Sequence, residues 1–129
     1  MQPHVIVADD QKYLRDILVA ILDDVGYRSI AVGTAAEALQ ALAQSGSELL
    51  VLDMSLAGPS GVEFLQHLRT EPVWRTLPVI FVSGDPGKLH AVDGRPNVRT
   101  LTKPFDTDAL IGAVIDMVGP PPARMSPSL

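Results

Sequence analysis

Residues 48–55, with the sequence ELLVLDMS, contain four consecutive apolar residues, 49–52, followed directly by the carboxylate of Asp53. An unbroken apolar run of this length is typical of a strand that is buried on both faces of a parallel sheet. Open α/β sheets bind ligands in the crevice beyond the carboxyl ends of their strands. The stretch therefore predicts that Asp53 lies at the functional edge of such a sheet.

Four further segments are rich in β-branched and other apolar residues and predict strands of similar length. Together with the first, the predicted strands cover residues 4–8, 27–32, 48–53, 78–82 and 98–101. Between them, the apolar residues change to the spacing of amphipathic helices. The predicted helices, with their caps, cover residues 14–25, 34–46, 62–70, 88–92 and 106–118. This alternation is typical of a doubly wound, five-stranded parallel sheet with helices on both faces, the flavodoxin-like arrangement.

Residues at the ends of these segments indicate helix boundaries and loops. Thr34 and Glu37 have the spacing of a capping box, and Asp106 can cap the last helix. Residues 56–61 read as a loop because of their glycine and proline content. Residues 84–97 contain several prolines and glycines, so we expect the fourth helix to be short or irregular.

The composition limits the class of protein. The chain has 129 residues, 47% of them hydrophobic, and a formal net charge of −5. This length suits one domain with its own core, and the negative charge argues against nucleic-acid binding, which needs a basic surface. Cysteine is absent, and the three histidines do not have a metal-ligand spacing. There is no apolar run of membrane-spanning length and no signal-peptide pattern, so we expect a soluble, cytoplasmic protein without membrane contacts.

The last residues differ in composition from the rest of the chain. We expect the folded domain to cover residues 1–118 and residues 119–129, GPPPARMSPSL, to form an extended proline-rich tail or the start of a linker. The folded pattern fills the chain, so we expect no DNA-binding or enzymatic output domain. A signal would then pass by contact with a partner protein.

Polar side chains follow four of the five predicted strands. They are Asp9 and Asp10 after the first, Asp53 after the third, Ser83 after the fourth and Lys103 after the fifth. Because the carboxyl ends of parallel strands share one edge, we expect these side chains to meet there. Three carboxylates about 5 Å apart repel one another by roughly 3 kcal/mol per pair at an effective dielectric constant of about 20, so such a cluster favours a cation. Oxygen ligands without histidine or cysteine suit Mg²⁺, which can also bind phosphate oxygens.

This set of side chains suits phosphoryl transfer, which needs positioning and charge neutralisation more than covalent help. Asp53 is the candidate nucleophile, because an aspartate can form an aspartyl-phosphate and Asp53 alone ends a central buried strand. Asp9 and Asp10 are candidate metal ligands, and Lys103 and Ser83 are candidate contacts to the phosphate. Simpler explanations exist for single residues: Asp9 or Asp10 could cap the first helix, and Ser83 could be a turn residue. The joint placement favours a functional site.

Five short motifs make the chain similar to the receiver domain of bacterial two-component response regulators, the family that includes the single-domain chemotaxis regulator. They are VADD at residues 7–10, LVLDM at 50–54, Gly61 eight residues after Asp53, VSG at 82–84 and TKPF at 102–105. The resemblance extends from about residue 4 to about residue 118 and so covers nearly the whole chain.

The resemblance implies that Asp53 accepts a phosphoryl group from a phosphohistidine of a sensor kinase or phosphotransfer protein. It also implies that Asp10, Asp53 and the backbone carbonyl of Ser55 bind Mg²⁺, with Asp9 acting largely through water. By the same resemblance, the chain hydrolyses its own acyl phosphate slowly and is otherwise not an enzyme.

Ser83 and Lys103 contact the phosphate in this resemblance, and Ser83 moves toward it on activation. Two positions depart from the family pattern. Thr100 stands where the family usually has a tyrosine, phenylalanine or histidine that rotates on activation, and Ala57 stands where it commonly has proline. The usual coupling between Ser83 and an aromatic side chain is therefore not carried over to this chain.

The leading hypothesis is a phosphorylation-dependent signalling switch: a stand-alone regulator, a phosphorelay intermediate or the receiver part of a hybrid kinase. One alternative is a phosphate-independent scaffold with the receiver fold, which Thr100 and the weak fourth helix leave open. A less favoured alternative is a phosphohydrolase with an aspartyl-phosphate intermediate, resembling the haloacid dehalogenases. The motif of those enzymes has an acidic residue two positions after the nucleophile, where this chain has Ser55.

Overall fold

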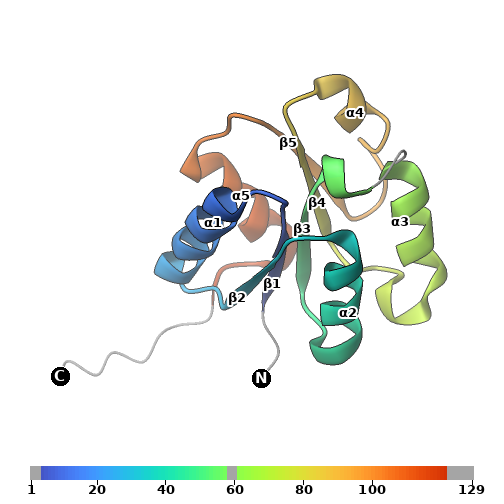
Figure 1. The fold of residues 1–129 in the computed structure, drawn as a ribbon, viewed down its shortest axis with the longest axis horizontal. Coiled ribbons are helices and arrows are strands. Elements are labelled where there is room, and N and C mark those ends of the chain that lie inside the picture. Colours follow the sequence, from blue (N-terminus) through green and yellow to red (C-terminus); the bar gives the residue numbers. More distant parts are fainter. Residues whose placement is uncertain (1–3, 58–60, 122–129) are drawn as a thin grey trace.

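A five-stranded parallel sheet forms the centre of the structure (Figure 1). The computed structural model describes residues 4–57 and 61–121. The strands lie in the order β2-β1-β3-β4-β5, with the bounds β1 (Val5–Ala8), β2 (Ser29–Val32), β3 (Leu49–Asp53), β4 (Val79–Ser83) and β5 (Val98–Thr102). Each neighbouring pair of strands is parallel. The predicted doubly wound parallel sheet is confirmed.

Helices cover both faces of this sheet (Figure 1). They are α1 (Lys12–Val25), α2 (Ala35–Ser45), α3 (Gly61–Thr70), α4 (Pro86–His90) and α5 (Thr107–Val118), with the short 3₁₀ helices η1 (Met54–Ala57) and η2 (Pro72–Trp74). Leu22 of α1 and Leu110 of α5 belong to one hydrophobic cluster. Leu42 of α2, Leu68 of α3 and Leu89 of α4 belong to the other. Two helices therefore cover one face and three cover the other.

The side chains of β3 alternate between these two clusters. Leu49 and Val51 lie in the cluster with α1 and α5, whereas Leu50 and Leu52 lie in the cluster with α2, α3 and α4. All four are at most 2% exposed. Both faces of the strand are buried, which explains why its sequence is apolar without alternation. Burying each such side chain contributes about 1.5–3 kcal/mol, so the core fixes the position of Asp53 at the end of this strand.

Side-chain caps stabilise the first turns of α2 and α5. Thr34 Oγ1 accepts a hydrogen bond from the backbone N–H of Glu37 at 3.0 Å, as the predicted capping box requires. The Glu37 carboxylate accepts a hydrogen bond from the backbone N–H of Gly33 at 3.1 Å. In a capping box the donor would be the N–H of Thr34, one residue later. Asp106 caps α5 as predicted, because its Oδ1 accepts a hydrogen bond from the N–H of Ala109 at 2.7 Å.

Helix α1 begins at Lys12, two residues earlier than its apolar pattern predicts. Its N-cap residue is Gln11, whose side chain makes no capping hydrogen bond. Asp9 lies outside the helix and accepts the backbone N–H of Gln11 at 2.8 Å. The alternative in which Asp9 or Asp10 is the N-cap residue is therefore wrong.

Helix α4 has five residues, so the expected short fourth helix is confirmed. It begins two residues earlier than the predicted 88–92, because Asp85 caps it by accepting the N–H of Gly87 at 2.9 Å. Proline follows this cap at the first helical position, where its missing N–H costs nothing. Within the loop predicted at 56–61, η1 extends to Ala57, and residues 58–60 lie outside the described part of the chain.

The predicted tail starts against the folded domain. The hydroxyl of Tyr27 donates a hydrogen bond to the carbonyl of Gly119 at 2.6 Å. Residues 122–129, the remainder of the predicted tail, lie outside the described residues. Within the described parts of the chain, every helix falls short of the length and apolarity that a membrane span needs.

Candidate functional site

The carboxyl ends of β1, β3, β4 and β5 lie along one edge of the sheet. The register of β1 with β3 places Asp9 next to Asp53. The register of β4 with β5 places Ser83 opposite Thr102, the residue before Lys103. The polar residues that follow these strands therefore share one edge, as the alternation of strands and helices predicts.

Lys103 forms the central ion pairs of this edge. Its Nζ lies 2.8 Å from Oδ2 of Asp53 and 3.3 Å from Oδ2 of Asp9. Both carboxylates are buried, whereas the lysine side chain is 25% exposed. The backbone N–H of Lys103 donates to the carbonyl of Ser83 at 2.8 Å, which holds the segment after β5 against β4. One ammonium group thus bridges two buried carboxylates from different strands.

Backbone N–H groups bind the other oxygen of each buried carboxylate. Oδ1 of Asp53 accepts the N–H of Ser55 at 3.0 Å, and Oδ1 of Asp9 accepts the N–H of Gln11 at 2.8 Å. The guanidinium of Arg15 donates to the backbone carbonyl of Asp9 at 2.9 Å. Each carboxylate is therefore held in one orientation by a lysine on one side and the backbone on the other.

These contacts shift the pKa values of the two buried carboxyls in opposite directions. Burial raises the pKa of Asp53, but the hydrogen bonds from Lys103 and Ser55 and the lysine charge outweigh it, so this pKa lies below its usual value. Burial raises the pKa of Asp9, and the opposing hydrogen bond from Gln11 does not offset burial and the negative charge of Asp53. For Lys103, burial lowers the pKa, but the hydrogen bond and charge of Asp53 raise it above its usual value. Asp53 is therefore an anion at neutral pH.

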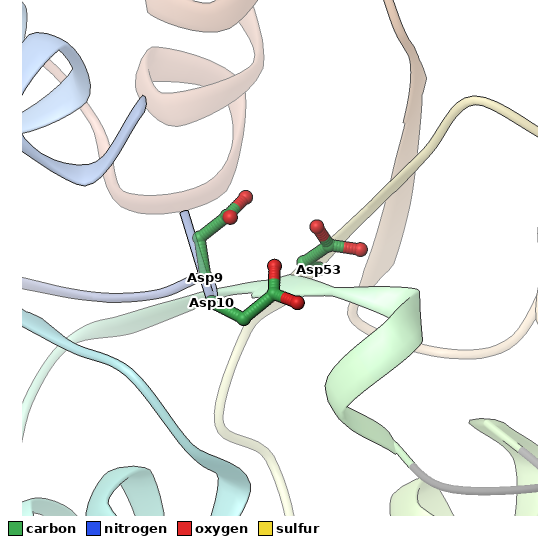
Figure 2. Close-up of side chains that lie close together, drawn as sticks. All are labelled: Asp9, Asp10 and Asp53. Carbon is green, nitrogen blue, oxygen red and sulfur yellow. The ribbon is translucent and has the colours of Figure 1, made fainter. Parts of the chain in front are cut away.

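Asp10 completes an acidic cluster with the two buried carboxylates. One carboxylate oxygen from each of Asp9, Asp10 and Asp53 lies within 4.8 Å of the others, and Figure 2 shows the three side chains gathered at the ends of β1 and β3. At this separation each pair repels by roughly 3 kcal/mol at an effective dielectric constant of about 20. Lys103 supplies only one opposite charge. Because the donors are all carboxylate oxygens, the cluster fits a hard divalent cation such as Mg²⁺.

Ser83 lies on the same edge, but among the described residues its hydroxyl makes no hydrogen bond to the side chain of Asp53 or Lys103. It is 7% exposed, and its Oγ accepts the backbone N–H of Asp85 at 3.0 Å. This local contact is the one expected of a turn residue, which was the simpler explanation for Ser83. A hydroxyl can donate and accept at the same time, so its own proton remains available to a second group.

The hydrogen bond from Arg15 to the carbonyl of Asp9 could not be predicted from the sequence. Arg15 lies on α1, and its Nη1 lies 3.0 Å from the position that a Cβ at Gly33 would occupy. A guanidinium that binds a backbone carbonyl follows no fixed sequence spacing, so the pattern of strands and helices does not reveal it. The Arg15 side chain extends from α1 past Gly33, in the loop after β2, to the carbonyl of Asp9.

This geometry corresponds to a known domain. A family model described as the response regulator receiver domain matches residues 5–115. The chain belongs to the response regulator receiver domain family. Receiver domains of this family are signalling modules of two-component systems and are generally not enzymes.

Proteins similar to this receiver domain include transcriptional regulators, a phosphotransferase and sensor kinases. The phosphate regulon transcriptional regulatory protein PhoB of Escherichia coli is 25% identical over 116 residues, which cover 88% of this chain and 51% of PhoB. The sporulation initiation phosphotransferase F of Bacillus subtilis is 26% identical over 117 residues, which cover 88% of this chain and 92% of that protein. This chain thus spans about half the length of PhoB and nearly all of the phosphotransferase.

A solved structure shows the same fold. The receiver domain of a sensor histidine kinase from Pseudomonas aeruginosa PAO1 is 21% identical to this receiver domain, with a TM-score of 0.75 over 92% of this chain and 99% of that chain. That structure contains a magnesium ion coordinated in its active-site cleft.

Proposed function

We propose that this receiver domain is a phosphorylation-dependent signalling switch whose phosphoacceptor is Asp53. The observation that carries the proposal is the surroundings of its carboxylate at the end of β3. Its Oδ2 lies 2.8 Å from Nζ of Lys103, and it shares an acidic cluster with Asp9 and Asp10. An ionised carboxylate between an ammonium group and a candidate cation site is placed to attack phosphorus and to stabilise the aspartyl-phosphate that results.

The phosphoryl donor in this proposal is a phosphohistidine of a sensor kinase or phosphotransfer protein. An oxygen of Asp53 attacks phosphorus, an O–P bond forms, and the P–N bond to the histidine breaks, with its electron pair going to the imidazole nitrogen. Asp53 is ready for this step because its lowered pKa keeps it ionised. Lys103 can pass from the carboxylate to a phosphoryl oxygen and remain paired with negative charge throughout. Slow attack by water on phosphorus breaks the O–P bond to Asp53 and releases inorganic phosphate and the free carboxylate.

Mg²⁺ is the cofactor that we assign to the acidic cluster. Asp10, Asp53 and the backbone carbonyl of Ser55 would hold it directly. Asp9 would act largely through water. When bound, the cation neutralises negative charge on the phosphoryl oxygens.

Ser83 is the residue to which we assign detection of the phosphoryl group. Its hydroxyl retains a proton to donate, and its Oγ binds the N–H of Asp85, which in turn caps α4. A hydroxyl that turns toward a phosphoryl oxygen would therefore change the start of this five-residue helix. Phosphorylation would shift the population of α4 positions through this contact. Thr100 is half-buried on β5, and we assign it no part in the readout.

The kinase or phosphotransfer protein would dock in a groove beside Lys103. The groove has a volume of about 520 Å³ and is lined mainly by apolar side chains of α1 and of the segment after β5, among them Leu14, Ile17, Ile21, Pro104 and Phe105. Tyr13, at the start of α1, is 79% exposed. An amphipathic helix of the partner fits such a groove, and the groove reaches the lysine that binds Asp53.

The extent of the receiver is also part of the proposal. We assign residues 1–118 to the receiver domain and residues 119–129 to a tail or the start of a linker. The family match over residues 5–115 supports this division, and the hydrogen bond from Tyr27 places Gly119, the first residue of the tail, against the domain. We place its action in the cytoplasm, where a sensor kinase has access to ATP.

Acetyl phosphate with Mg²⁺ tests phosphate acceptance directly. The whole chain is incubated with the donor, and its intact mass is measured. We expect the mass of one phosphoryl group on the native chain and none on Asp53→Asn. Asp16→Asn is the matched control, because Asp16 is an exposed aspartate that pairs with Lys12. An unchanged mass of the native chain, or phosphate on Asp53→Asn, would contradict the proposal.

A further inference from the structure

We propose a second binding site, for a small organic anion, near the amino ends of the strands, on the side of the sheet opposite to Asp53. It is a pocket of about 320 Å³ lined by Leu65, Gln66, Arg69, Arg75, Arg95 and Pro96. Arg75 precedes β4 and Arg95 precedes β5, whereas Asp53 stands at the carboxyl end of β3. In a parallel sheet these two edges face away from each other. The pocket is therefore separate from the candidate phosphoacceptor site and does not depend on the proposed function.

Three arginines line this pocket in a chain whose net charge is −5. Among the residues that the structure describes, no carboxylate forms an ion pair with Arg69, Arg75 or Arg95. This includes Glu71 and Asp93, which lie close to them in sequence. Guanidinium groups that share a pocket without a counter-ion repel one another, and an anion between them would replace this repulsion by attraction. The charge of the pocket is thus complementary to an acidic ligand.

Arg69 is the fixed member of the three. Its Nη1 donates to the carbonyls of Trp74 at 3.0 Å and Leu77 at 2.7 Å. Its Nη2 donates to the carbonyls of Pro96 at 3.2 Å and Asn97 at 3.4 Å. Arg69 is half-buried, and this burial lowers its pKa. Since all four acceptors are neutral carbonyls, these contacts orient the guanidinium but leave its positive charge without a counter-ion.

The guanidinium groups of Arg75 and Arg95 are held by fewer contacts than that of Arg69. Both are exposed, and in the described chain the Arg75 side chain has no hydrogen-bond partner. Arg95 donates only through Nε, to the carbonyl of Ala91 at 3.4 Å. Their planar ends are therefore free to bind a carboxylate or phosphate group with two parallel hydrogen bonds.

The size and walls of the pocket indicate the class of ligand. Ligand pockets in proteins have volumes of about 300–1,000 Å³ and combine apolar walls with a few polar groups. This pocket lies at the small end of that range, and Leu65, Pro96 and the arginine stems give it apolar walls. It suits a compact di- or tricarboxylate or a small phosphorylated acid. A glutamate or aspartate side chain of a partner protein offers the same carboxylate chemistry.

Trp74 is a fluorescent residue close to this pocket, one position before Arg75. It is the single tryptophan of the chain, and its carbonyl binds Arg69. Its fluorescence is followed while the whole chain, without Mg²⁺, is titrated with citrate, succinate or inorganic phosphate, and with sodium chloride at matched ionic strength. We expect a saturable change with at least one of the three acids and none with chloride. A response that does not saturate, or that chloride reproduces, would overturn the proposal.

Matched variants locate the binding. The double variant Arg75→Gln, Arg95→Gln should weaken it at least tenfold. Arg99→Gln, which removes an arginine that pairs with Asp116 instead, should bind as the native chain does. Asp53→Asn should also bind normally, because the phosphoacceptor edge is not involved. Unchanged binding by the double variant would overturn the proposal, and thermal unfolding of each variant shows that the folded chain is being compared.

A peptide arm separates the two sources of the carboxylate. An alternating glutamate–leucine peptide is titrated in the same way and in competition with citrate. Binding that is tighter than that of citrate and lost in the double variant supports the site and identifies a protein segment as its occupant. Tighter binding of citrate supports the site with a free organic acid as occupant. If the three acids and the peptide all fail to bind, the site does not exist.

Discussion

Nζ of Lys103 lies 2.8 Å from Oδ2 of Asp53, although the two residues are 50 positions apart in the sequence. β4 separates β5 from β3 in the sheet, so a long side chain is needed to bridge this distance. The same ammonium group also reaches Asp9. The loss of Lys103 should therefore affect both the stability of the fold and the chemistry at Asp53.

The substitution Lys103→Gln should lower the free energy of unfolding by about 1–2 kcal/mol at neutral pH. Removing one partner of a fully buried pair costs about 3–5 kcal/mol, and we expect less here because the lysine side chain is 25% exposed. Urea unfolding measures the change. The control Lys12→Gln breaks an exposed pair with Asp16 and should cost at most about 0.5 kcal/mol. Equal stability of the two variants would show that the bridging contact contributes nothing.

Asp10 should destabilise the chain in the absence of a divalent cation and stabilise it in the presence of one. Asp10→Asn removes one charge from the acidic cluster, so its Tm in EDTA should be roughly 1–4 °C above that of the native chain. Mg²⁺ at about 100 times its Kd should stabilise the native chain by about 2.7 kcal/mol, and Asp10→Asn should lose most of this gain. Thermal unfolding with EDTA and with Mg²⁺ tests both effects. An equal response of both chains to Mg²⁺ would remove Asp10 from the cation site.

The pKa shifts of Asp53 and Asp9 predict opposite contributions to acid stability. The carboxyl of an unfolded chain titrates near pH 3.8, and the folded chain binds the Asp53 proton less tightly. Ionised Asp53 therefore stabilises the fold above that pH, and this stability is lost as the pH falls through the folded pKa. Asp9, whose pKa is raised, contributes increasing stability as the pH falls toward 3.8.

Urea unfolding of variants between about pH 5 and about pH 2.5 separates these contributions. Asp53→Asn should lose less stability than the native chain over this range, because it lacks the carboxylate whose protonation is unfavourable. Asp9→Asn should lose more, because it lacks the compensating group. Parallel curves for the three chains would contradict the linkage.

Loss of the Ser83 hydroxyl should weaken the structural response of α4 to phosphorylation more than it weakens the phosphorylation of Asp53. Ser83→Ala removes the acceptor for the N–H of Asp85 and should cost about 0.5–1.5 kcal/mol. It should still accept phosphate, but the amide resonances of α4 should no longer move on phosphorylation, as followed by NMR. Ser83→Thr keeps the hydroxyl and should retain the shift. The same movement in Ser83→Ala would exclude Ser83 as the detecting group, and no movement in the native chain would favour a phosphate-independent scaffold.

The buried strands could be predicted from the sequence because β3 and β4 are covered on both faces. A run such as 49–52 has no competing explanation once helices are excluded by its length. The edge residues Asp9, Asp53 and Lys103 followed from the strand ends alone. Their contacts did not, because alternation of strands and helices does not fix the order β2-β1-β3-β4-β5, on which the reach of Lys103 depends.

Helix starts and backbone contacts were harder to predict for physical reasons. α1 begins at Lys12 after a glutamine that makes no capping bond, so no capping residue indicated its start. The hydroxyl of Ser83 binds a backbone N–H two residues away, a local contact that any turn serine can make. Arg15 binds a carbonyl through a guanidinium for which no sequence spacing exists.

The most direct measurement is the chemical identification of the phosphorylated side chain. The native chain is treated with acetyl phosphate and Mg²⁺, then reduced with borohydride, which converts an aspartyl-phosphate to homoserine. Peptide mass mapping then locates the altered residue. The proposed function predicts homoserine at position 53 alone, with unmodified aspartates at positions 9 and 10. Homoserine at either of those positions, or at none, would contradict the assignment of Asp53 as phosphoacceptor.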